Sequence, residues 1–363
     1  MSTLMISSST HSYQVVIKKG LRTQLKDHLD KKYAKVLVIT DSKVGPLYLD
    51  EVINAFPEDV EVSHSIVSAG EASKSMEQYS NLLNACITNQ LDRNSLIIGL
   101  GGGMVGDLSG FVASTYLRGV DFLQMPTSIL AHDSSVGGKV AINHKQGKNL
   151  IGCFYSPIQV IYDTETLQTL PVEEIRSGYG EVVKHALLSD MSWCEQLLVE
   201  DLSALSYQQL EDHLTLGIQV KAEVVEQDEK EHGVRRHLNL GHTLAHAMEA
   251  ELGYGEITHG EAVAIGIWFA MKISEDSFKV SLPTKSYVQW LIKNEYPIDT
   301  LLKVNPEKLV NRMRWDKKTI DNNIHFVLLE AVGSPTVEKI SETKLHQYLN
   351  DFVEEVSQID KRN

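Results

Sequence analysis

Three histidines and one glutamate carry the strongest chemical signal in this sequence. His242 and His246 stand four residues apart in LNLGHTLAHAME, and His259 follows in THGEAVAIG beside a new apolar helical pattern. Two histidines at this spacing lie on one face of a helix, and an upstream carboxylate at Glu181 adds an oxygen ligand for a divalent cation. Zinc is the leading candidate, although the zinc-protease pattern H-E-x-x-H is not met. The spacing leaves open which histidines bind the metal and which are ordinary core residues.

The segment around Glu181, SGYGEVVKH, contains two glycines within a helical pattern. Each glycine costs a helix ~1 kcal/mol relative to alanine, so we expect another part of the protein to approach the backbone closely here. Glu181 and Lys184 share one helix face at an i,i+3 step. The alternative interpretation of that pair is an ordinary surface ion pair.

A glycine-rich turn predicts a second binding function. The sequence SLIIGLGGGMVGD runs from a buried type of strand into a helical segment, and Gly101, Gly103 and Gly106 satisfy the spacing G-x-G-x-x-G. In this context the backbone amides and the helix N-terminus can face a pyrophosphate, which favours a dinucleotide. The alternative is a tight turn without a ligand, because Asp121 precedes the next strand instead of following it. A P-loop is excluded, since residues 137–139 (GGK) lack the upstream Gly and the following Ser or Thr.

Cationic and amide side chains gather between residues 126 and 149. We interpret this segment as irregular, with three glycines and the side chains of Lys139, Asn143, Lys145, Lys148 and Asn149. Ammonium groups and exposed amides suit phosphoryl oxygens, and Asp133 can accept hydrogen bonds from sugar hydroxyls. A solvated polar loop, with Asp133 as a cap, is the alternative. Arg118 in YLRG is a further candidate for an anion ligand.

The elements that must position these residues divide the chain into two domains. Short β-rich runs alternate with helical patterns in the first half, which predicts βαβ units and a parallel sheet covered on its faces. These runs begin at Tyr13, Val36, Val60, Ser95, Phe122 and Val160. From Pro171 onward helical periodicity takes over, and 363 residues exceed the ~250–300 that one core supports. We therefore expect an α/β fold, with a parallel-sheet domain at 1–170 and a mostly α-helical domain at 171–363.

Composition and charge narrow the class of protein. The formal net charge of −14 argues against a general nucleic-acid binder, because phosphate backbones require a basic face. The three cysteines, Cys86, Cys153 and Cys194, lack a C-x-x-C spacing and indicate a reducing setting. The beginning of the sequence lacks the pattern of a secretory signal, and the most apolar stretch, 262–271, is too short to cross a bilayer. We therefore expect a cytoplasmic protein that binds neither nucleic acid nor membranes.

Several sequence blocks, in order along residues 13–330, resemble the 3-dehydroquinate synthase family of sugar-phosphate cyclases. They are GGGMVGDLSGF, YLRG, PTSILAHDSSVGGK, GKNLIG, TLP, GYGEVVK, LNLGHTLAHAME and HGEAV. The resemblance implies a Rossmann-like NAD-binding domain, an α-helical domain that binds zinc or Co2+, and a homodimer. Two positions depart from the family: Ser128 stands where Thr is commoner, which keeps the hydroxyl, and His132 stands where many relatives have Gln.

The resemblance also implies the site residues. Its metal ligands are Glu181, His242 and His259, which leaves His246 for the substrate phosphate. Its NAD contacts are Asp41, Glu71, Lys74, Gly102, Gly103, Asp107, Thr127, Ser128, Lys139, Lys148 and Thr169. The residues it places in the chemistry are Asp133, Lys139, Lys184, Asn239 and His246, and further substrate contacts are Arg118, Asn149, Lys221, Arg235 and Lys318. Arg118 is expected to act from a partner subunit.

The implied substrate is a small sugar phosphate of the shikimate pathway, 3-deoxy-D-arabino-heptulosonate 7-phosphate. The implied reaction combines transient oxidation by NAD, elimination of phosphate, re-reduction and intramolecular aldol closure to 3-dehydroquinate. The phosphate is expected at Lys139, Asn149, His246 and Arg118, the carboxylate at Lys221 and Arg235, and the ring hydroxyls at Asp133, Lys184 and Asn239.

Three alternative functions differ from this one in what they consume. A 2-deoxy-scyllo-inosose synthase would use glucose 6-phosphate, which has no carboxylate and gives Lys221 and Arg235 no partner. A metal-dependent glycerol or alcohol dehydrogenase would share the glycine turn but would accumulate NADH. A metal-bound structural or ligand-binding module would release no phosphate from any sugar phosphate, and it fits poorly with so many ionisable groups beside a nucleotide turn.

Overall fold

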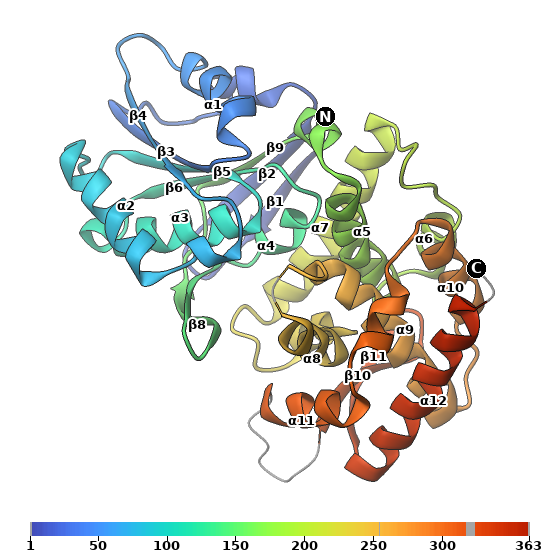
Figure 1. Cartoon of the computed structure of the whole chain (residues 1–363). Helices are drawn as coiled ribbons and strands as arrows, with labels where there is room; N and C mark the ends of the chain where they lie inside the picture. Colours follow the sequence, from blue (N-terminus) through green and yellow to red (C-terminus); the bar gives the residue numbers. More distant parts are fainter. Residues whose placement is uncertain (1, 254, 317–323, 362–363) are drawn as a thin grey trace. The chain divides into compact units, whose positions relative to one another are not determined.

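The computed structural model describes residues 2–253, 255–316 and 324–361 (Figure 1). The chain forms two compact units, the first made of residues 1–170 and 206–229 and the second of residues 171–205 and 230–363. This division differs from the one expected at 170/171 in a single segment, 206–229, which returns to the first unit. Among the described residues, no helix combines the length and apolar character that a membrane span requires.

The first unit is built on a seven-stranded sheet with the order β1-β2-β9-β6-β5-β3-β4. Its strands are β1 (Ser2–Ser7), β2 (Ser12–Lys18), β3 (Lys35–Asp41), β4 (Glu61–Val67), β5 (Leu96–Gly101), β6 (Asp121–Pro126) and β9 (Gln159–Asp163). All neighbours pair in parallel except β1, which is antiparallel to β2. The six β-rich runs of the sequence are therefore confirmed as strands of a mainly parallel sheet, and β1 is an additional strand that we did not predict.

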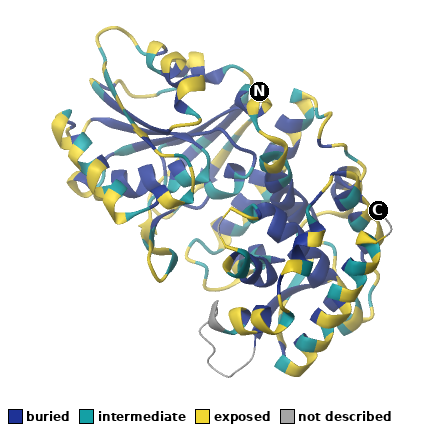
Figure 2. Ribbon diagram, in the orientation of Figure 1, coloured by how far each residue is buried: buried dark blue, intermediate teal, exposed yellow. Residues whose placement is uncertain are grey.

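Helices cover both faces of this sheet, and each face has its own apolar core (Figure 2). Along β3, Val36 and Val38 point into the core that holds α1 (Gly45–Asn54), whereas Leu37 and Ile39 point into the core that holds α2 (Met76–Thr88) and α3 (Gly103–Thr115). Burial on both faces explains why the central strands are continuous apolar runs without polar alternation. The arrangement is the expected α/β fold, with helices on both sides of a parallel sheet.

Residues 126–149 are more regular than we predicted. They contain the short helix α4 (Ala131–Ser134), strand β7 (Lys139–His144) and the start of strand β8 (Gly147–Phe154), which pairs with β7 in antiparallel fashion. The prediction of an irregular segment was wrong. The β-rich runs VAI and LIG are short, and the lysines, asparagines and glycine that separate them concealed the hairpin in the sequence pattern. Among its described residues, the first unit also has five 3-10 segments, namely η1 (Leu21–Thr23), η2 (Leu25–Asp27), η3 (Glu71–Ser73), η4 (Tyr116–Arg118) and η5 (Thr164–Thr169).

Helix α7 (Tyr207–Gln227) is the part of the second half that belongs to the first unit. A capping box between Ser206 and Gln209 begins the helix, and its apolar stripe packs beside β1, β2 and η5. The side chain of Glu211 accepts hydrogen bonds from the Lys19 amide at 3.1 Å and from the Thr164 hydroxyl at 3.4 Å. The stripe predicted the helix correctly, but an apolar stripe does not say which layer it will cover.

The described residues of the second unit are mostly helical, as expected, and they include a β-hairpin that we did not predict. Its helices are α5 (Val172–Leu187), α6 (Met191–Leu197), η6 (Val234–Asn239), α8 (His242–Leu252), α9 (His259–Phe278), α10 (Thr284–Lys293), η7 (Ile298–Lys303), α11 (Pro306–Asp316) and α12 (Glu342–Asp360), and the hairpin is β10 (Ile324–Ala331) with β11 (Ser334–Ile340). Helix α9 is the centre of this unit, since Trp268 and Phe269 pack on Phe352 of α12 with ring centroids 4.7 and 5.1 Å apart.

Candidate active site

The glycine turn joins β5 to α3 in the first unit, and the packing around it explains the glycines. A Cβ added at Gly101 would lie 2.6 Å from the Val105 side chain, and one at Gly103 would lie 3.0 Å from the Ser134 hydroxyl. The helix begins after Gly102, which has no side chain to cap the first amides of α3. The turn therefore fits an anionic group such as a pyrophosphate, which would bind these amides and the positive end of the helix dipole.

The turn also lies at the point of the sheet where ligands usually bind. The chain runs from β3 outward to β4 and then returns to the other side of β3 to form β5. In open α/β sheets, ligands bind at the carboxyl ends of the strands where the order reverses in this way. Asp41 ends β3 at this edge, and its Oδ1 accepts hydrogen bonds from the amides of Lys43 at 2.8 Å and Val44 at 3.0 Å. Asp41 thus shapes the turn beside the predicted dinucleotide site.

Lys74 connects three further predicted residues. Its side chain is 3% exposed, and its ammonium group donates to Asp107 Oδ2 at 2.7 Å and Asn149 Oδ1 at 2.5 Å. Glu71 Oε1 lies 3.5 Å from the same nitrogen and also accepts a hydrogen bond from Asn143 at 2.8 Å. Burial raises the pKa of the Asp107 carboxyl, against the lowering effect of Lys74. The network ties η3, α3 and the β7–β8 hairpin together.

A second pair joins Asp133 on α4 to Lys221 on α7. The Lys221 ammonium lies 3.0 Å from Asp133 Oδ2 and also contacts the Asp133 carbonyl oxygen. Because α7 packs in the first unit, it brings a residue predicted to bind the substrate carboxylate next to one predicted to bind hydroxyls. His132, the departure from the family pattern, is fully buried, with its Nδ1 2.6 Å from the Ile129 carbonyl oxygen.

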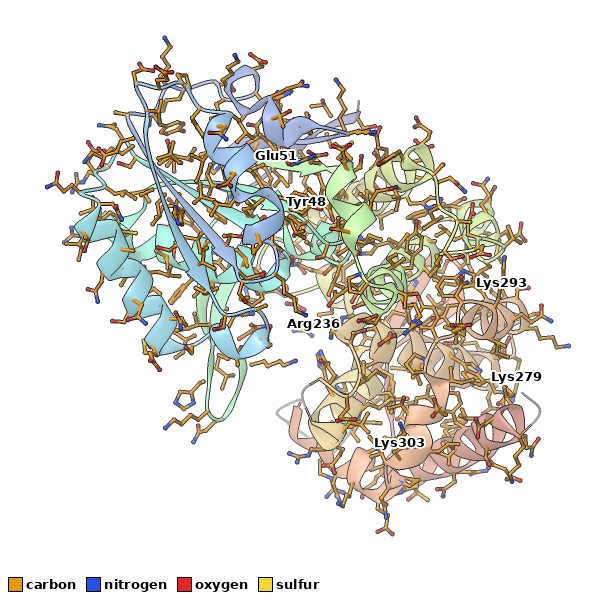
Figure 3. The ribbon with its side chains drawn as sticks, turned by 45° about the horizontal axis from the view of Figure 1, so that its top comes forward. Tyr48, Glu51, Arg236, Lys279, Lys293 and Lys303 are labelled. Carbon is orange, nitrogen blue, oxygen red and sulfur yellow. The ribbon has the colours of Figure 1, made fainter. Side chains whose placement is uncertain are left out.

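The remaining predicted residues of the first unit differ in their burial. Thr127 and Ser128 are buried after β6, and the Thr127 amide donates to the Gly101 carbonyl at 3.1 Å. Thr169 at the end of η5 lies 2.6 Å from the Tyr48 hydroxyl, which belongs to α1 and is labelled in Figure 3. The side chains of Lys139 and Arg118 are exposed and Lys148 is half-buried. Arg118 has a φ of 70°, an uncommon conformation for a residue with a side chain.

The strongest cluster lies in the second unit, where Glu181 of α5 meets the first residues of α8 and α9. Glu181 Oε1 is 3.4 Å from His242 Nε2 and 3.4 Å from His259 Nε2. Two ligand atoms bound tetrahedrally to zinc at ~2.1 Å lie roughly 3.4 Å apart, so these separations match a shared cation. Glu181 is only 1% exposed. A carboxylate and two imidazoles in this arrangement fit a divalent metal, which supports the predicted set of ligands.

Two pairs of glycines explain how the three helices come this close. A methyl group at Gly180 of α5 would overlap the carbonyl oxygen of Gly260 on α9. A methyl group at Gly266 of α9 would overlap the carbonyl oxygen of Gly241, which precedes α8 and has a φ of 82°. The close approach that the glycines of SGYGEVVKH predicted is therefore present at Gly180. These contacts hold the backbones near enough for three short side chains to converge.

The protonation of the two histidines follows from their surroundings. Burial lowers the pKa of His242 to about 4, against the opposing effect of Glu181, so its ring is neutral. Burial also acts to lower the pKa of His259, but hydrogen bonds with Glu181 and Glu249 outweigh it and raise this pKa to about 10. The cluster thus attracts one positive charge between its carboxylates. A divalent cation would take the place of the proton on His259.

Other predicted residues surround this cluster or lie on η6. Lys184 contacts Glu181 Oε2 from the next turn of α5 and is 1% exposed. The His246 ring has its centroid 5.4 Å from that of His242 and 5.9 Å from that of His259. Arg235 is 2% exposed, and the Asn239 amide donates to Glu231 Oε1 at 3.0 Å. The predicted substrate contact Lys318 lies outside the described residues.

Sequence reasoning gave Glu249 no role, and it did not pair Asn143 or Glu231 with any of the predicted residues. Glu249 contacts His259, Asn143 contacts Glu71, and Glu231 contacts Asn239. Glu249 could have been found, because it follows His242 by seven residues and therefore shares its helix face. The other two contacts join segments or turns whose pairing no spacing predicts.

The packing of α5 on α9 gives a first testable prediction. Gly180→Ala would force the two backbones apart, and we expect the free energy of unfolding to fall by about 2–4 kcal/mol and the bound metal to be lost in part. Denaturant unfolding and elemental analysis measure the two effects. Val172→Ala, at an exposed position of the same helix, is the control and should change neither. A variant at Gly180 with normal stability and metal content would contradict this account of the glycines.

Comparison with known proteins agrees with this architecture. Residues 64–177 match the 3-dehydroquinate synthase N-terminal family and residues 178–319 match the 3-dehydroquinate synthase C-terminal family. The 3-dehydroquinate synthase of Oceanobacillus iheyensis is 48% identical over 359 residues, which cover 99% of this chain and 100% of that protein.

Solved structures of two other enzymes are similar over nearly the whole chain. A 2-deoxy-scyllo-inosose synthase complexed with carbaglucose-6-phosphate, NAD+ and Co2+ has a TM-score of 0.88 and 25% identity, and the match covers 96% of this chain and 100% of that one. The 2-epi-5-epi-valiolone synthase of Streptomyces hygroscopicus, with NAD+ and Zn2+ bound, has a TM-score of 0.81 and 22% identity, covers 98% and 99% of the two chains, and shows a shared fold. The chain has the fold of this class of cyclases. Within that class, the family matches and the high identity show that the chain belongs to the 3-dehydroquinate synthase family.

Proposed function

We propose that this protein converts 3-deoxy-D-arabino-heptulosonate 7-phosphate to 3-dehydroquinate and inorganic phosphate. The observation that carries the proposal is the 48% identity to a 3-dehydroquinate synthase along 99% of the chain. The convergence of Glu181, His242 and His259 supports it, because the reaction needs an electrophile for substrate oxygens and these residues suit a divalent cation. In class the enzyme is a carbon–oxygen lyase.

The proposed cofactors are NAD and a divalent metal, with zinc as the first candidate and Co2+ as the second. The cyclase structures with NAD+ and Co2+ or Zn2+ support this choice. Glu181, His242 and His259 would hold the metal. The glycine turn and the carboxyl end of β3 would hold NAD. When bound, NAD supplies a reversible hydride acceptor and the metal supplies a Lewis acid for hydroxyl oxygens.

The two anionic ends of the substrate require positive groups in an acidic protein. We assign the phosphate to Lys139, Asn149, His246 and Arg118, and the carboxylate to Lys221 and Arg235. Charge-assisted hydrogen bonds of this kind are about twice as strong as neutral ones. In the structure Asn149 accepts from Lys74 and Lys221 pairs with Asp133, so these groups are held by protein partners that the substrate would replace.

Asp133, Lys184 and Asn239 are assigned to the ring hydroxyls. Asp133 pairs with Lys221 and can accept hydrogen bonds from hydroxyls, and the Lys184 ammonium, which is buried against Glu181, would donate to a substrate oxygen next to the metal ligands. Asn239 is oriented by its hydrogen bond to Glu231. The departing phosphate can itself take the proton that is lost in the elimination, so the mechanism requires no separate protein base. These residues therefore bind and orient the ring.

The stoichiometry of the reaction gives a direct test. Removal of phosphoric acid from the heptulosonate phosphate leaves the composition of 3-dehydroquinate, so there is no net oxidation. We expect one inorganic phosphate per substrate and no accumulation of NADH when the protein is incubated with catalytic amounts of NAD and zinc. Phosphate release and absorbance of NADH are followed together, with glucose 6-phosphate as the control substrate. NADH formed in proportion to substrate would indicate a dehydrogenase, and turnover of glucose 6-phosphate alone would indicate an inosose-type cyclase.

We further propose that the enzyme works in the cytoplasm as a homodimer. All three cysteines, Cys86, Cys153 and Cys194, are free, which agrees with a reducing compartment. Arg118 is exposed, so its side chain is accessible to a partner subunit. Its left-handed backbone conformation supports a functional role, because strained backbone is often retained for function. Light scattering on the purified protein measures the oligomeric state, and a monomer at working concentration would contradict this part of the proposal.

A further inference from the structure

The metal-ligand candidate His259 makes a contact on the side of its ring that faces away from Glu181. Its Nε2 lies 3.4 Å from Glu181 Oε1, whereas its Nδ1 lies 3.1 Å from Glu249 Oε2. Glu249 is 9% exposed and is not among the metal, cofactor or substrate residues proposed above. One imidazole therefore stands between two carboxylates, each of which faces a different ring nitrogen.

Helix α8 delivers Glu249 to this position. His242, His246 and Glu249 follow one another at steps of four and three residues, so all three lie on the same face of the helix. The start of α8 is fixed on α9 because Gly241 packs against the backbone of Val263 and Ile267. Helix α8 thus provides both the proposed metal ligand His242 and Glu249, the hydrogen-bond acceptor for the second ligand histidine, His259.

The backbone of His259 is fixed independently of Glu249. His259 is the first residue of α9, and a capping box between Thr258 and Glu261 closes that helix end. Glu261 is in turn held by Arg176 of α5 at 2.7 Å. The freedom that remains is the rotation of the imidazole ring, and this is what the contact with Glu249 controls.

The chemistry of the contact follows from the two partners. A carboxylate only accepts hydrogen bonds, so Nδ1 of His259 must donate, and in the neutral ring the lone pair is then on Nε2, which faces Glu181. His242 is arranged in the same way, with its Nδ1 3.2 Å from the Leu240 carbonyl oxygen and its Nε2 toward Glu181. We propose that Glu249 is a positioning residue that orients His259 and strengthens it as a metal ligand. This inference rests on the metal site of the proposed function.

A second cation site is the competing explanation for the same residues. The ligand atoms of His246, Glu249 and His259 also lie within 4.8 Å of one another. A cation there would have to bind Nδ1 of His259, which would leave two divalent charges on one ring. The hydrogen bond avoids that repulsion and uses the arrangement that metal-bound histidines commonly show. The two explanations differ in the number of metal ions per chain.

The test measures metal affinity as well as activity. Glu249→Gln keeps an oxygen acceptor but removes the charge, and Glu249→Ala removes the acceptor. We expect zinc to bind about 10-fold more weakly in the first variant and roughly 30- to 100-fold more weakly in the second, measured by competition with a chelator. The absorption spectrum of the Co2+-loaded protein should also shift in both variants, because the His259 ligand changes its basicity and orientation.

Glu251→Gln is the matched control. Glu251 lies two residues further along α8 and pairs with Arg312 at 2.5 Å, away from His259. This variant should bind zinc as the unchanged protein does, and thermal unfolding of the metal-free forms checks that all variants fold. Unchanged zinc affinity in Glu249→Ala would overturn the proposal. Two zinc ions per chain in the unchanged protein, with one lost on substitution, would also overturn it in favour of the second site.

The two proposals fail in distinguishable ways. If the unchanged protein binds one zinc but releases no phosphate from the heptulosonate phosphate, the proposed function is wrong while the effect of Glu249 on zinc affinity is still measurable. If phosphate is released and the Glu249 variants bind zinc normally, the function stands and the positioning role is wrong.

Discussion

His242→Ala should leave a folded protein that retains almost no metal and releases phosphate at least about a thousandfold more slowly. The unchanged protein is expected to hold one ion per chain, and the variant leaves Glu181 and His259 as the only two members of the proposed ligand set. Two protein ligands are fewer than the three that catalytic zinc sites use. Loss of the Lewis acid removes several kcal/mol of transition-state stabilisation, which corresponds to that factor in rate.

The controls separate the loss of metal from the loss of fold. His242 is the first residue of α8, and its ring lies beside the rings of His246 and His259, with centroids 5.4 and 5.3 Å away. Circular dichroism and thermal unfolding of the variant should resemble those of the metal-free unchanged protein. His64→Ala, an exposed histidine on β4, should keep its metal and its activity. A full complement of metal in His242→Ala, measured by elemental analysis, would show that the ion is held elsewhere.

The parts of the fold that sequence analysis predicted are those in which one local pattern has one outcome. Runs such as VLVIT and SLIIGL became central strands because an apolar run bounded by turns can be buried on both faces of a parallel sheet. The partner of an amphipathic helix has no such local signal. Helix α7 has a clear apolar stripe, but its packing on β1 and β2 is a contact between residues about 200 positions apart, as in the hydrogen bond from Ser7 to Glu226.

The candidate site likewise has parts that short sequence segments predicted and parts that they did not. The spacing of His242 and His246, and the glycines before Glu181, indicated a metal cluster and a close helix contact from short segments alone. Four residues with suitable side chains lie near one another, and their spacing does not say which of them bind the metal. Only the family resemblance distinguished the metal ligands from their neighbour His246. The hydrogen bond between Lys74 and Asn149 was not predictable, since it depends on the β7–β8 hairpin folding back onto η3.

The second large effect is expected at Arg235, the proposed ligand of the substrate carboxylate. Its side chain is 2% exposed on η6, so a planar guanidinium there is shielded from water and can bind a carboxylate through two parallel hydrogen bonds. Lysine keeps the charge but provides a single point contact. We expect Arg235→Lys to raise KM and lower kcat, with kcat/KM reduced about 30- to 100-fold, equivalent to roughly 2–3 kcal/mol.

Arg236→Lys is a matched control for this prediction, because Arg236 is the next residue on η6 and is exposed (Figure 3). The exposed guanidinium is surrounded by water, so its replacement by an ammonium should change kcat/KM less than twofold. The carboxylate assignment also predicts a difference between substrates: an analogue of the heptulosonate phosphate without the carboxylate should react equally slowly with the Arg235→Lys and unchanged proteins, since the lost contact is then absent from both. An unchanged kcat/KM for the natural substrate in Arg235→Lys would show that Arg235 does not bind the carboxylate. An equal loss of kcat/KM with the analogue would show that Arg235 supports the fold of η6 instead.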